Sequence, residues 1–202
     1  MPSESYGQFN NRNRTTGRLM THPLYTLNHG RPETALALLA PLVERSDWVA
    51  EATLGRRPFH DDEAVAGALV ETILQAGPDR RLTLFQAHPE LAGREAIAGE
   101  MTVESQGEQG RLGLMALDHA TATRLRELNA AYRARFSHPF IIALHRVPDL
   151  DTLFTSFERR LTATPLEEHI STLAEIASVI RARAATAFGK SLSSSYSQEH
   201  VL

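Results

Sequence analysis

The amino-acid sequence predicts an all-α protein, a single-domain helical bundle with a long C-terminal helix. Apolar residues recur at helical spacing through most of the body of the chain. Only residues 140–144, Phe-Ile-Ile-Ala-Leu, have the unbroken apolar character of a buried strand. Because one strand without a partner cannot form a sheet, the helical reading is favoured throughout.

The first helices are expected to be short. Residues 32–46 place apolar residues at helical spacing, but Pro41 should end or kink this segment. Residues 62–76 carry a clear apolar stripe, and a glycine-proline pair stops it. A further short helix is expected over residues 79–87, and Pro89 should prevent it from continuing.

The middle of the chain predicts three more helices. Ser105 and Glu108 have the spacing of a capping box, serine followed three residues later by glutamate, so a helix is expected to begin there. Residues 121–136 and 150–161 each carry an apolar stripe at helical spacing.

The last helix has the clearest signals. Thr164 can cap it, Pro165 suits its first turn, and Glu167 and Glu168 suit its positive dipole end. The stripe of this helix is expected to comprise Leu166, Ile170, Leu173, Ala177, Ile180 and Ala184. The pattern continues to Gly189.

Composition excludes several classes of function. The 202 residues include 42% hydrophobic and 22% charged residues, which is typical of a globular domain, and no apolar run approaches the length that spans a bilayer. A formal net charge of −3 gives no field that would recruit nucleic acid or an anionic membrane. The chain has no cysteine, which excludes disulfides, thiolate metal sites and cysteine nucleophiles. We therefore expect a soluble protein that binds neither nucleic acid nor a membrane, and the absence of cysteine allows a reducing, cytoplasmic location.

The two ends differ from the body. Residues 1–20 are polar and are expected to form a flexible arm, although their arginines leave a transit peptide as an alternative. Residues 190–202 are rich in serine and are expected to form a flexible tail. Residues 21–189 then make up one helical domain.

Familiar catalytic motifs are absent from the sequence. It has no glycine-rich phosphate loop, no nucleophile elbow and no His-Glu-x-x-His. A metal hydrolase built from His60, Asp61, Asp62 and His119 is conceivable, but the first three are more simply a capping cluster. The sequence therefore predicts no metal site.

Several polar motifs lie where helices are expected to begin or end. They are His88-Pro-Glu-Leu-Ala-Gly, residues 102–109 (Thr-Val-Glu-Ser-Gln-Gly-Glu-Gln), residues 128–132 (Leu-Asn-Ala-Ala-Tyr) and residues 136–141 (Phe-Ser-His-Pro-Phe-Ile). In order and spacing they resemble the 2-oxo-4-hydroxy-4-carboxy-5-ureidoimidazoline (OHCU) decarboxylases of urate degradation. The resemblance extends over about residues 24–188 and implies an all-helical, cofactor-free carboxy-lyase that forms a homodimer and yields (S)-allantoin and CO2.

The resemblance assigns His88 and Glu108 as catalytic. An imidazole that titrates near neutrality can move the proton that replaces CO2, as acid or as base. A carboxylate near His88 would favour the imidazolium and fix its tautomer. Read locally, the two residues are a helix-ending histidine and a capping-box partner, and the capping role of Glu108 does not exclude contact with substrate.

The remaining site residues would bind the substrate. The resemblance places Ser105, Gln109, Pro89, Phe140 and Ile141 there. The amide of Gln109 can both donate to and accept from ureido groups. The alternatives are that Gln109 is an exposed helix residue and that Ser105 is a helix cap.

The substrate carboxylate needs a cation, and arginine offers a planar fork for it. Arg181 and Arg183 flank the stripe of the last helix on opposite sides, so periodicity does not choose between them. Their spacing from Glu175 makes Arg183 the match to the arginine of the family.

The sequence departs from the family at Ser137, which replaces a glycine, and at His138, which replaces an apolar residue. His138 would be either a second titratable group or a partly exposed loop residue. The rival to the enzyme is an inactive binding or assembly module that uses the stripe over residues 166–184. The joint presence of His88, Glu108 and Arg183 favours the enzyme.

Overall fold

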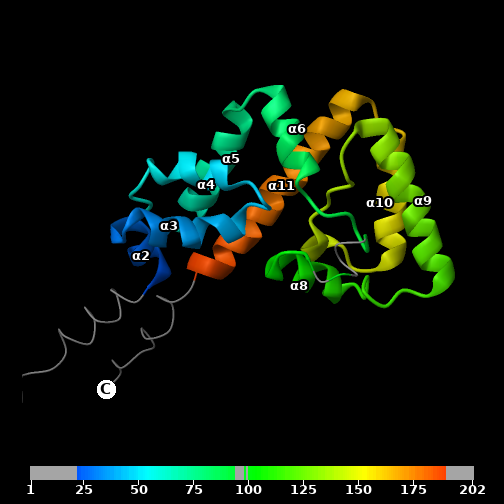
Figure 1. Ribbon diagram of the computed structural model, residues 1–202, viewed down its shortest axis with the longest axis horizontal. Helices are drawn as coiled ribbons and strands as arrows, with labels where there is room; N and C mark the ends of the chain where they lie inside the picture. Colours follow the sequence, from blue (N-terminus) through cyan, green and yellow to red (C-terminus); the bar gives the residue numbers. More distant parts are fainter. Residues whose placement is uncertain (1–21, 94–97, 99, 190–202) are drawn as a thin grey trace, which may run out of the picture.

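The computed structural model describes residues 22–93, 98 and 100–189. The flexible arm expected over residues 1–20 and the tail expected over residues 190–202 lie outside the described residues. Within the described part the chain forms helices joined by turns and contains no strand, which confirms the all-α prediction (Figure 1). The apolar run at residues 140–144 is an extended segment that leads into a single 3-10 turn.

The elements have the following bounds. In chain order they are α2 (Pro23–His29), α3 (Pro32–Leu39), η1 (Ala40–Leu42), α4 (Asp47–Leu54), α5 (Asp62–Gln75), α6 (Pro78–Gln86), α8 (Val103–Arg111), α9 (His119–Phe136), η2 (Leu144–Arg146), α10 (Leu150–Leu161) and α11 (Pro165–Phe188).

Most of the expected helices are confirmed within two residues. The first expected helix ends as α3, and Pro41 lies in the 3-10 turn η1 that follows it. The Thr164 hydroxyl accepts a hydrogen bond from the Glu167 backbone while the Glu167 carboxylate accepts one from the Thr164 backbone, so α11 begins with a capping box. Two short helices, α2 and α4, were not predicted.

The predicted start of α8 is wrong. The helix begins two residues earlier, at Val103, and Thr102 is its cap: the Thr102 hydroxyl accepts a hydrogen bond of 3.3 Å from the Ser105 backbone. Ser105 and Glu108 therefore lie inside the helix and do not form a capping box. Both side chains are left to interact with other elements.

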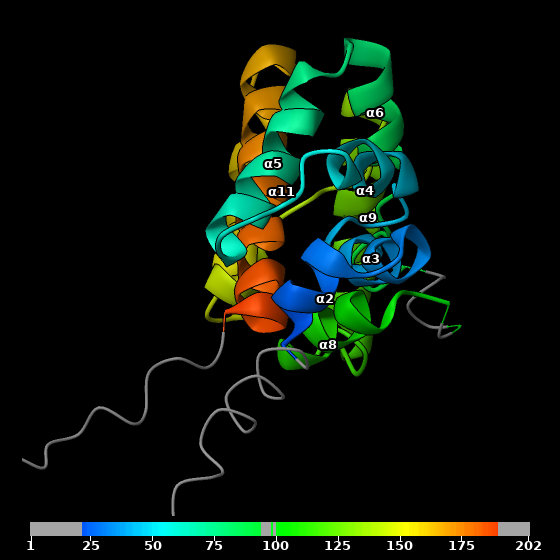
Figure 2. The same cartoon turned by 90° about the vertical axis from the view of Figure 1, so that its left-hand side faces the viewer.

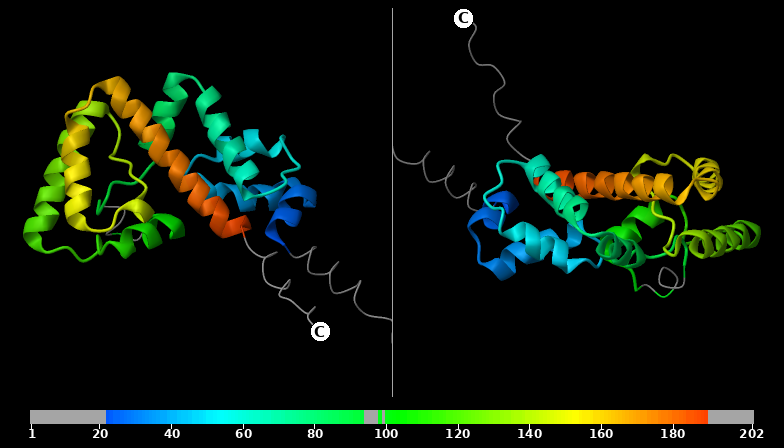
Figure 3. Two further views of the ribbon diagram at one scale, coloured as in Figure 1. Left: turned by 180° about the vertical axis from the view of Figure 1, so that it is seen from behind. Right: turned by 90° about the horizontal axis from the view of Figure 1, so that it is seen from above.

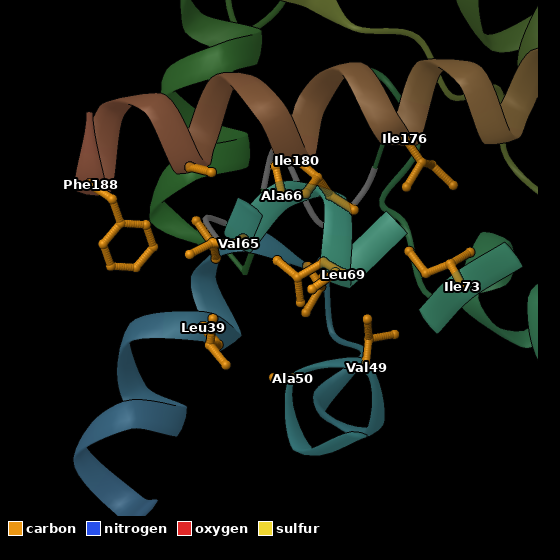
Figure 4. Close-up of a cluster of buried hydrophobic side chains, with 14 of the residues drawn as sticks. Leu39, Val49, Ala50, Val65, Ala66, Leu69, Ile73, Ile176, Ile180 and Phe188 are labelled. Carbon is orange, nitrogen blue, oxygen red and sulfur yellow. The ribbon is translucent and has the colours of Figure 1, made fainter. Parts of the chain in front are cut away.

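Two hydrophobic clusters form the core, one at each end of the elongated molecule (Figure 1). The first cluster lies among α2–α5 and the C-terminal half of α11, and Figure 4 shows Ile176 and Ile180 of α11 facing Leu69 and Ile73 of α5. The second cluster lies between α9 and α10 and includes residues of the 140–147 segment. Two further views show α5 lying beside α11 (Figures 2 and 3).

The buried face of α11 differs from the predicted stripe near its N-terminus. Leu166 and Ile170 are 69% and 58% exposed. The buried residues are Glu168, Thr172, Ile176, Ile180, Ala184 and Phe188, spaced four apart. The later part of the stripe is occupied by α5 and is not available to a partner.

A buried ion pair takes the place of apolar packing at the start of α11. Glu168, expected only to favour the helix dipole, is fully buried and bonds Arg160 of α10, which is 2% exposed. The hydroxyls of Tyr132 and Thr172 also donate to Glu168. Burial raises the pKa of Tyr132. The positive charge of Arg160 acts against this shift, and the hydrogen bond to Glu168 adds to it. This network joins α9, α10 and α11.

Candidate active site

A small pocket lies where α11 meets the ends of η1 and α6. It is narrow and partly open to solvent. Its walls comprise Leu42, Val43, Glu44, Ile73, Leu84, His88, Ile176, Val179, Ile180 and Arg183. Three of these side chains are ionisable, and they come from segments far apart in the sequence.

Arg183 is the centre of an ionic cluster beside the pocket. Its Nε and Nη2 donate to the two carboxylate oxygens of Glu108 at 2.8 and 2.9 Å, a bidentate pair. Its Nη1 and Nη2 also lie 3.4 Å from Oε2 of Glu44. Burial alone would lower the pKa of Arg183, but bonding to Glu108 and Glu44 raises it overall. The guanidinium therefore carries its charge at every relevant pH.

Glu44 is the site residue that the sequence analysis missed. It lies two residues after the end of η1, and its side chain is 2% exposed. The hydroxyl of Ser105 donates to Glu44 at 2.7 Å and that of Thr102 donates at 3.1 Å. A glutamate after an apolar run has no local signal of function, since its partner Arg183 lies far along the chain.

His88 reaches the pocket because α6 ends just before it. The Nδ1 of His88 lies 2.9 Å from the backbone oxygen of Leu84, which can only accept, so Nδ1 carries the proton of the neutral ring and Nε2 is left as an acceptor. Burial lowers the pKa of His88 to about 4, outweighing the opposite effects of the Leu84 bond and the Glu44 charge. A nearby carboxylate, that of Glu44, does favour the imidazolium, but burial outweighs this effect in the ligand-free site. A backbone carbonyl, not a carboxylate, fixes the tautomer.

Gln109 and Pro89 shape the segment next to His88. Gln109 is buried, and its carbonyl accepts from the Ala92 backbone at 2.9 Å while its amide lies 3.4 Å from the Glu90 carbonyl. Pro89 is half-buried. Neither residue is among the described side chains that line the pocket. The exposed-helix reading of Gln109 is wrong, and its bonds in this structure are to the protein.

Phe140 and Ile141 lie on opposite sides of one extended segment. Phe140 stacks on Phe157 in the second cluster with ring centres 3.8 Å apart, whereas Ile141 packs in the first cluster with residues of the pocket wall. Arg160 donates to the Ile141 carbonyl at 2.6 Å, and Glu175 accepts from the Ala143 backbone at 2.8 Å. Side chains from two helices thus fix the path of this segment.

The turn before this segment contains Ser137 and His138, the two positions at which the sequence departs from the family pattern. Ser137 takes the left-handed conformation, φ 64°, that glycine favours, so the turn at the end of α9 keeps this shape despite the substitution. His138 is 4% exposed, which contradicts the expectation of a partly exposed loop residue. It lies edge-on to Phe85 and Tyr132, and burial lowers its pKa.

Arg181 and Arg183 are separated clearly by the structure. Arg181 points away from the pocket and bonds the exposed Glu63 at 3.1 Å, with about half of its side chain in solvent. Arg183 has a side chain only 9% exposed and lines the pocket. The geometry thus favours Arg183, as the spacing from Glu175 does.

The residues suggested for a metal site have structural partners. Asp61 caps α5 by accepting from the Ala64 backbone at 2.7 Å, and its other oxygen lies 3.0 Å from His60. His119 begins α9. In the described ranges, no group of three or more histidine, aspartate or glutamate side chains is arranged to hold a metal ion.

The arrangement brings an anion-binding group, a proton carrier and the buried carboxylate of Glu44 to one small pocket, and Glu108 bonds Arg183 beside it. Arg183 supplies positive charge for a carboxylate, and the free Nε2 of neutral His88 can accept a proton and later return it. The Leu84 carbonyl holds His88 in place. Oxygens of two glutamates and a serine hold Arg183, which suits a reaction in which charge moves within a partly dry site.

The chain is similar to known proteins over most of its length. Residues 28–185 match the family model described as OHCU decarboxylase. A 2-oxo-4-hydroxy-4-carboxy-5-ureidoimidazoline decarboxylase of Amia calva is 35% identical over 145 residues, which cover 70% of this chain and 81% of that protein.

Two solved structures have the same fold. A crystal structure of (S)-allantoin synthase is 23% identical with a TM-score of 0.62, and the match covers 82% of this chain and 54% of that one. A crystal structure of OHCU decarboxylase in the presence of (S)-allantoin is 17% identical with a TM-score of 0.59, covering 80% of this chain and all of the other. From the match over residues 28–185 and the relative at 35% identity, the chain belongs to the OHCU decarboxylase family.

Proposed function

We propose that this protein is a carboxy-lyase that converts OHCU to (S)-allantoin and CO2 in urate degradation, without a cofactor. The observation that carries the proposal is that His88 and Arg183 line one pocket in a chain of this family. An inactive scaffold of the same fold would need neither a buried arginine nor a histidine with a free ring nitrogen beside it.

Each group has a defined task in this reaction. Arg183 attracts the substrate carboxylate. Loss of CO2 breaks the bond between the carboxyl carbon and the ring carbon, and the electron pair moves toward the adjacent ring C=N, which gives an enol-type intermediate. His88 accepts a hydrogen bond from the substrate hydroxyl at Nε2 and then carries that proton to the neighbouring carbon, on one face of the ring. This order makes His88 a base first and an acid second.

The remaining predicted residues divide into two groups. We assign Ser105 and Ile141 to the border of the bound substrate, because Ser105 bonds Glu44 and Ile141 packs with the pocket wall. We assign Gln109 and Pro89 to the shape of the segment after His88, and Phe140 to the path of the 140–144 segment. A bound substrate would compete with the present bonds of Gln109.

The activity can be tested directly. OHCU is unstable, so it is generated in solution from urate by the two preceding enzymes of the pathway, and circular dichroism follows the optically active product. The protein should accelerate formation of (S)-allantoin, and a His88→Ala variant of normal far-ultraviolet spectrum should not. If the wild-type protein left the rate and the optical purity unchanged, the inactive-module alternative would replace the enzyme.

We further propose a cytoplasmic homodimer, as the resemblance implies. Leu166 and Ile170 support the dimer, because they form an exposed apolar pair one turn apart on α11. Light scattering should give twice the chain mass, and Leu166→Glu with Ile170→Glu should give a monomer; a monomeric wild-type protein would end this proposal. In the described ranges no helix has the length and apolar character needed to cross a bilayer, and cell fractionation tests the compartment.

A further inference from the structure

The hydrogen-bonding capacity of Arg183 is already used in the ligand-free protein. Nε donates to Glu108, Nη1 to the Pro41 carbonyl at 3.2 Å and to Glu44, and Nη2 to Glu108, Glu44 and Ser105. The bidentate edge of the guanidinium is occupied by the carboxylate of Glu108. A substrate carboxylate that binds Arg183 in the same fork must therefore displace a protein group.

Glu108 is the group most easily displaced. Its side chain is 29% exposed, and Arg183 is the only side chain that it bonds in the described part of the chain. Glu44, by contrast, is 2% exposed and also holds Ser105 and Thr102. The helix that carries Glu108, α8, buries the polar residues Ser105 and Gln109, whereas Glu108 itself lies at the partly exposed side of the helix.

The groups around Arg183 leave no net positive charge for an anionic ligand. Glu44 from the η1 end and Glu108 from α8 face the guanidinium, and His88 from the α6 end lines the same pocket. His138 lies close enough to influence His88, and burial keeps both histidines mainly neutral at pH 7 by lowering their pKa values. Two carboxylates thus surround one cation. A third carboxylate would repel both unless a proton entered with it.

We propose that the substrate carboxylate replaces Glu108 on Arg183, and that the site takes up one proton as this exchange occurs, held at first by the displaced Glu108. Glu108 is then an internal placeholder for the substrate carboxylate. This inference rests on the proposed function and adds the protonation state of the bound complex to it.

The reaction uses the proton that is taken up. Decarboxylation of a carboxylate gives CO2 and leaves an electron pair on the organic product, so each turnover consumes one proton from outside. The C–C bond breaks, the pair moves into the ring, and the ring nitrogen that receives it is protonated, while His88 transfers the hydroxyl proton to carbon. A proton taken up at binding is already in the pocket when the bond breaks, and product release restores the Glu108–Arg183 pair.

The test compares a carboxylate probe with a neutral one. Hydantoin-5-acetate carries a ring ureide and a carboxylate, whereas (S)-allantoin carries the ring and no carboxylate. Isothermal titration calorimetry at pH 7 in two buffers of different ionisation enthalpy measures the protons bound per site. Wild-type protein should take up about one proton with hydantoin-5-acetate and about none with (S)-allantoin, and the Kd of the carboxylate probe should rise about tenfold per pH unit from pH 6.5 to 8.

Two matched variants locate the proton. Glu108→Gln removes the displaced carboxylate with little change of shape, so uptake should fall to about zero and the probe should bind several-fold more tightly at pH 8. Glu63→Gln removes a glutamate that pairs with Arg181 on the surface, and it should behave as wild type. If Glu108→Gln failed to fold, Glu108→Ala would serve in its place.

Three results would overturn the inference. These are wild-type binding of hydantoin-5-acetate without proton uptake, uptake that persists in Glu108→Gln, and absence of measurable probe binding at millimolar concentration. None of these results bears on the proposed activity, because the circular dichroism assay measures turnover of OHCU separately. Conversely, loss of that activity with normal proton uptake would reject the decarboxylase function and leave the carboxylate exchange intact.

Discussion

Replacing His88 by glutamine should change how the stability of this protein depends on pH. The pKa of an unfolded histidine is about 6.5 and burial lowers that of folded His88 to about 4. Between these values the unfolded chain binds more protons than the folded one, so the histidine destabilises the fold as the pH falls. At about 1.4 kcal/mol per pKa unit, the loss between pH 7 and pH 4 is about 3 kcal/mol.

Urea unfolding measures this contribution. The single tryptophan, Trp48, packs partly buried against the first cluster with Arg80 over its ring, so its fluorescence should report unfolding. The free energy of unfolding is compared for wild type and His88→Gln at several pH values from 7 to 4. Glutamine can still donate to the Leu84 carbonyl but does not titrate, so the wild type should lose about 3 kcal/mol more than the variant over this range.

The comparison cancels the other titrating groups. His138 and His169 also have pKa values lowered by burial, and both are present in the two proteins. Parallel pH dependences for wild type and variant would refute the reasoning, since they would show that His88 is not held neutral by the fold. The assigned role as a base in the resting enzyme would fall with it.

Further predictions concern turnover and the buried charges. His88→Ala should reduce turnover by about 10²–10⁴-fold in the circular dichroism assay, the usual contribution of a positioned acid or base, and near-normal turnover would remove it from catalysis. Arg183→Met should reduce kcat/KM at least tenfold and also lower the melting temperature, because it leaves Glu44 buried without its cation, whereas Arg181→Met should change both little. A larger loss of kcat/KM from Arg181→Met than from Arg183→Met would place the anion site at Arg181. Arg160→Met should cost about 3–5 kcal/mol in urea unfolding, and a cost below about 1 kcal/mol would show that its carboxylate partner is not charged when buried.

Local signals predicted the helices well where they were strong. A capping threonine, an N-terminal proline and an apolar face predicted α11 almost to the residue, and the glycine-proline stop predicted the end of α5. The start of α8 was wrong because Thr102 and Ser105 are both suitable caps three residues apart, and the sequence offers no rule for choosing between them. Glu168 was misread because its charge partner Arg160 and its partner Tyr132 belong to other helices.

Some features of the candidate site could likewise be predicted from the sequence, and others could not. Motifs near one another in the chain identified His88, Ser105 and Glu108, and the structure brings these elements together around Arg183. Glu44 was missed because a lone glutamate carries no signal until its distant partner is known. The low pKa of His88 was also beyond the sequence, since it depends on how many atoms of other elements exclude water from the ring.

The position of α11 has a consequence for synthesis of the protein. Its C-terminal half closes the first hydrophobic cluster and its N-terminal half supplies the carboxylate that neutralises Arg160 beside the second. While the ribosome is still translating residues 165–188, the first cluster lacks the side chains of α11 that close it and the buried Arg160 lacks its carboxylate, although α9 already covers the apolar face of α10. We therefore expect full protease protection of nascent chains only once α11 has left the exit tunnel.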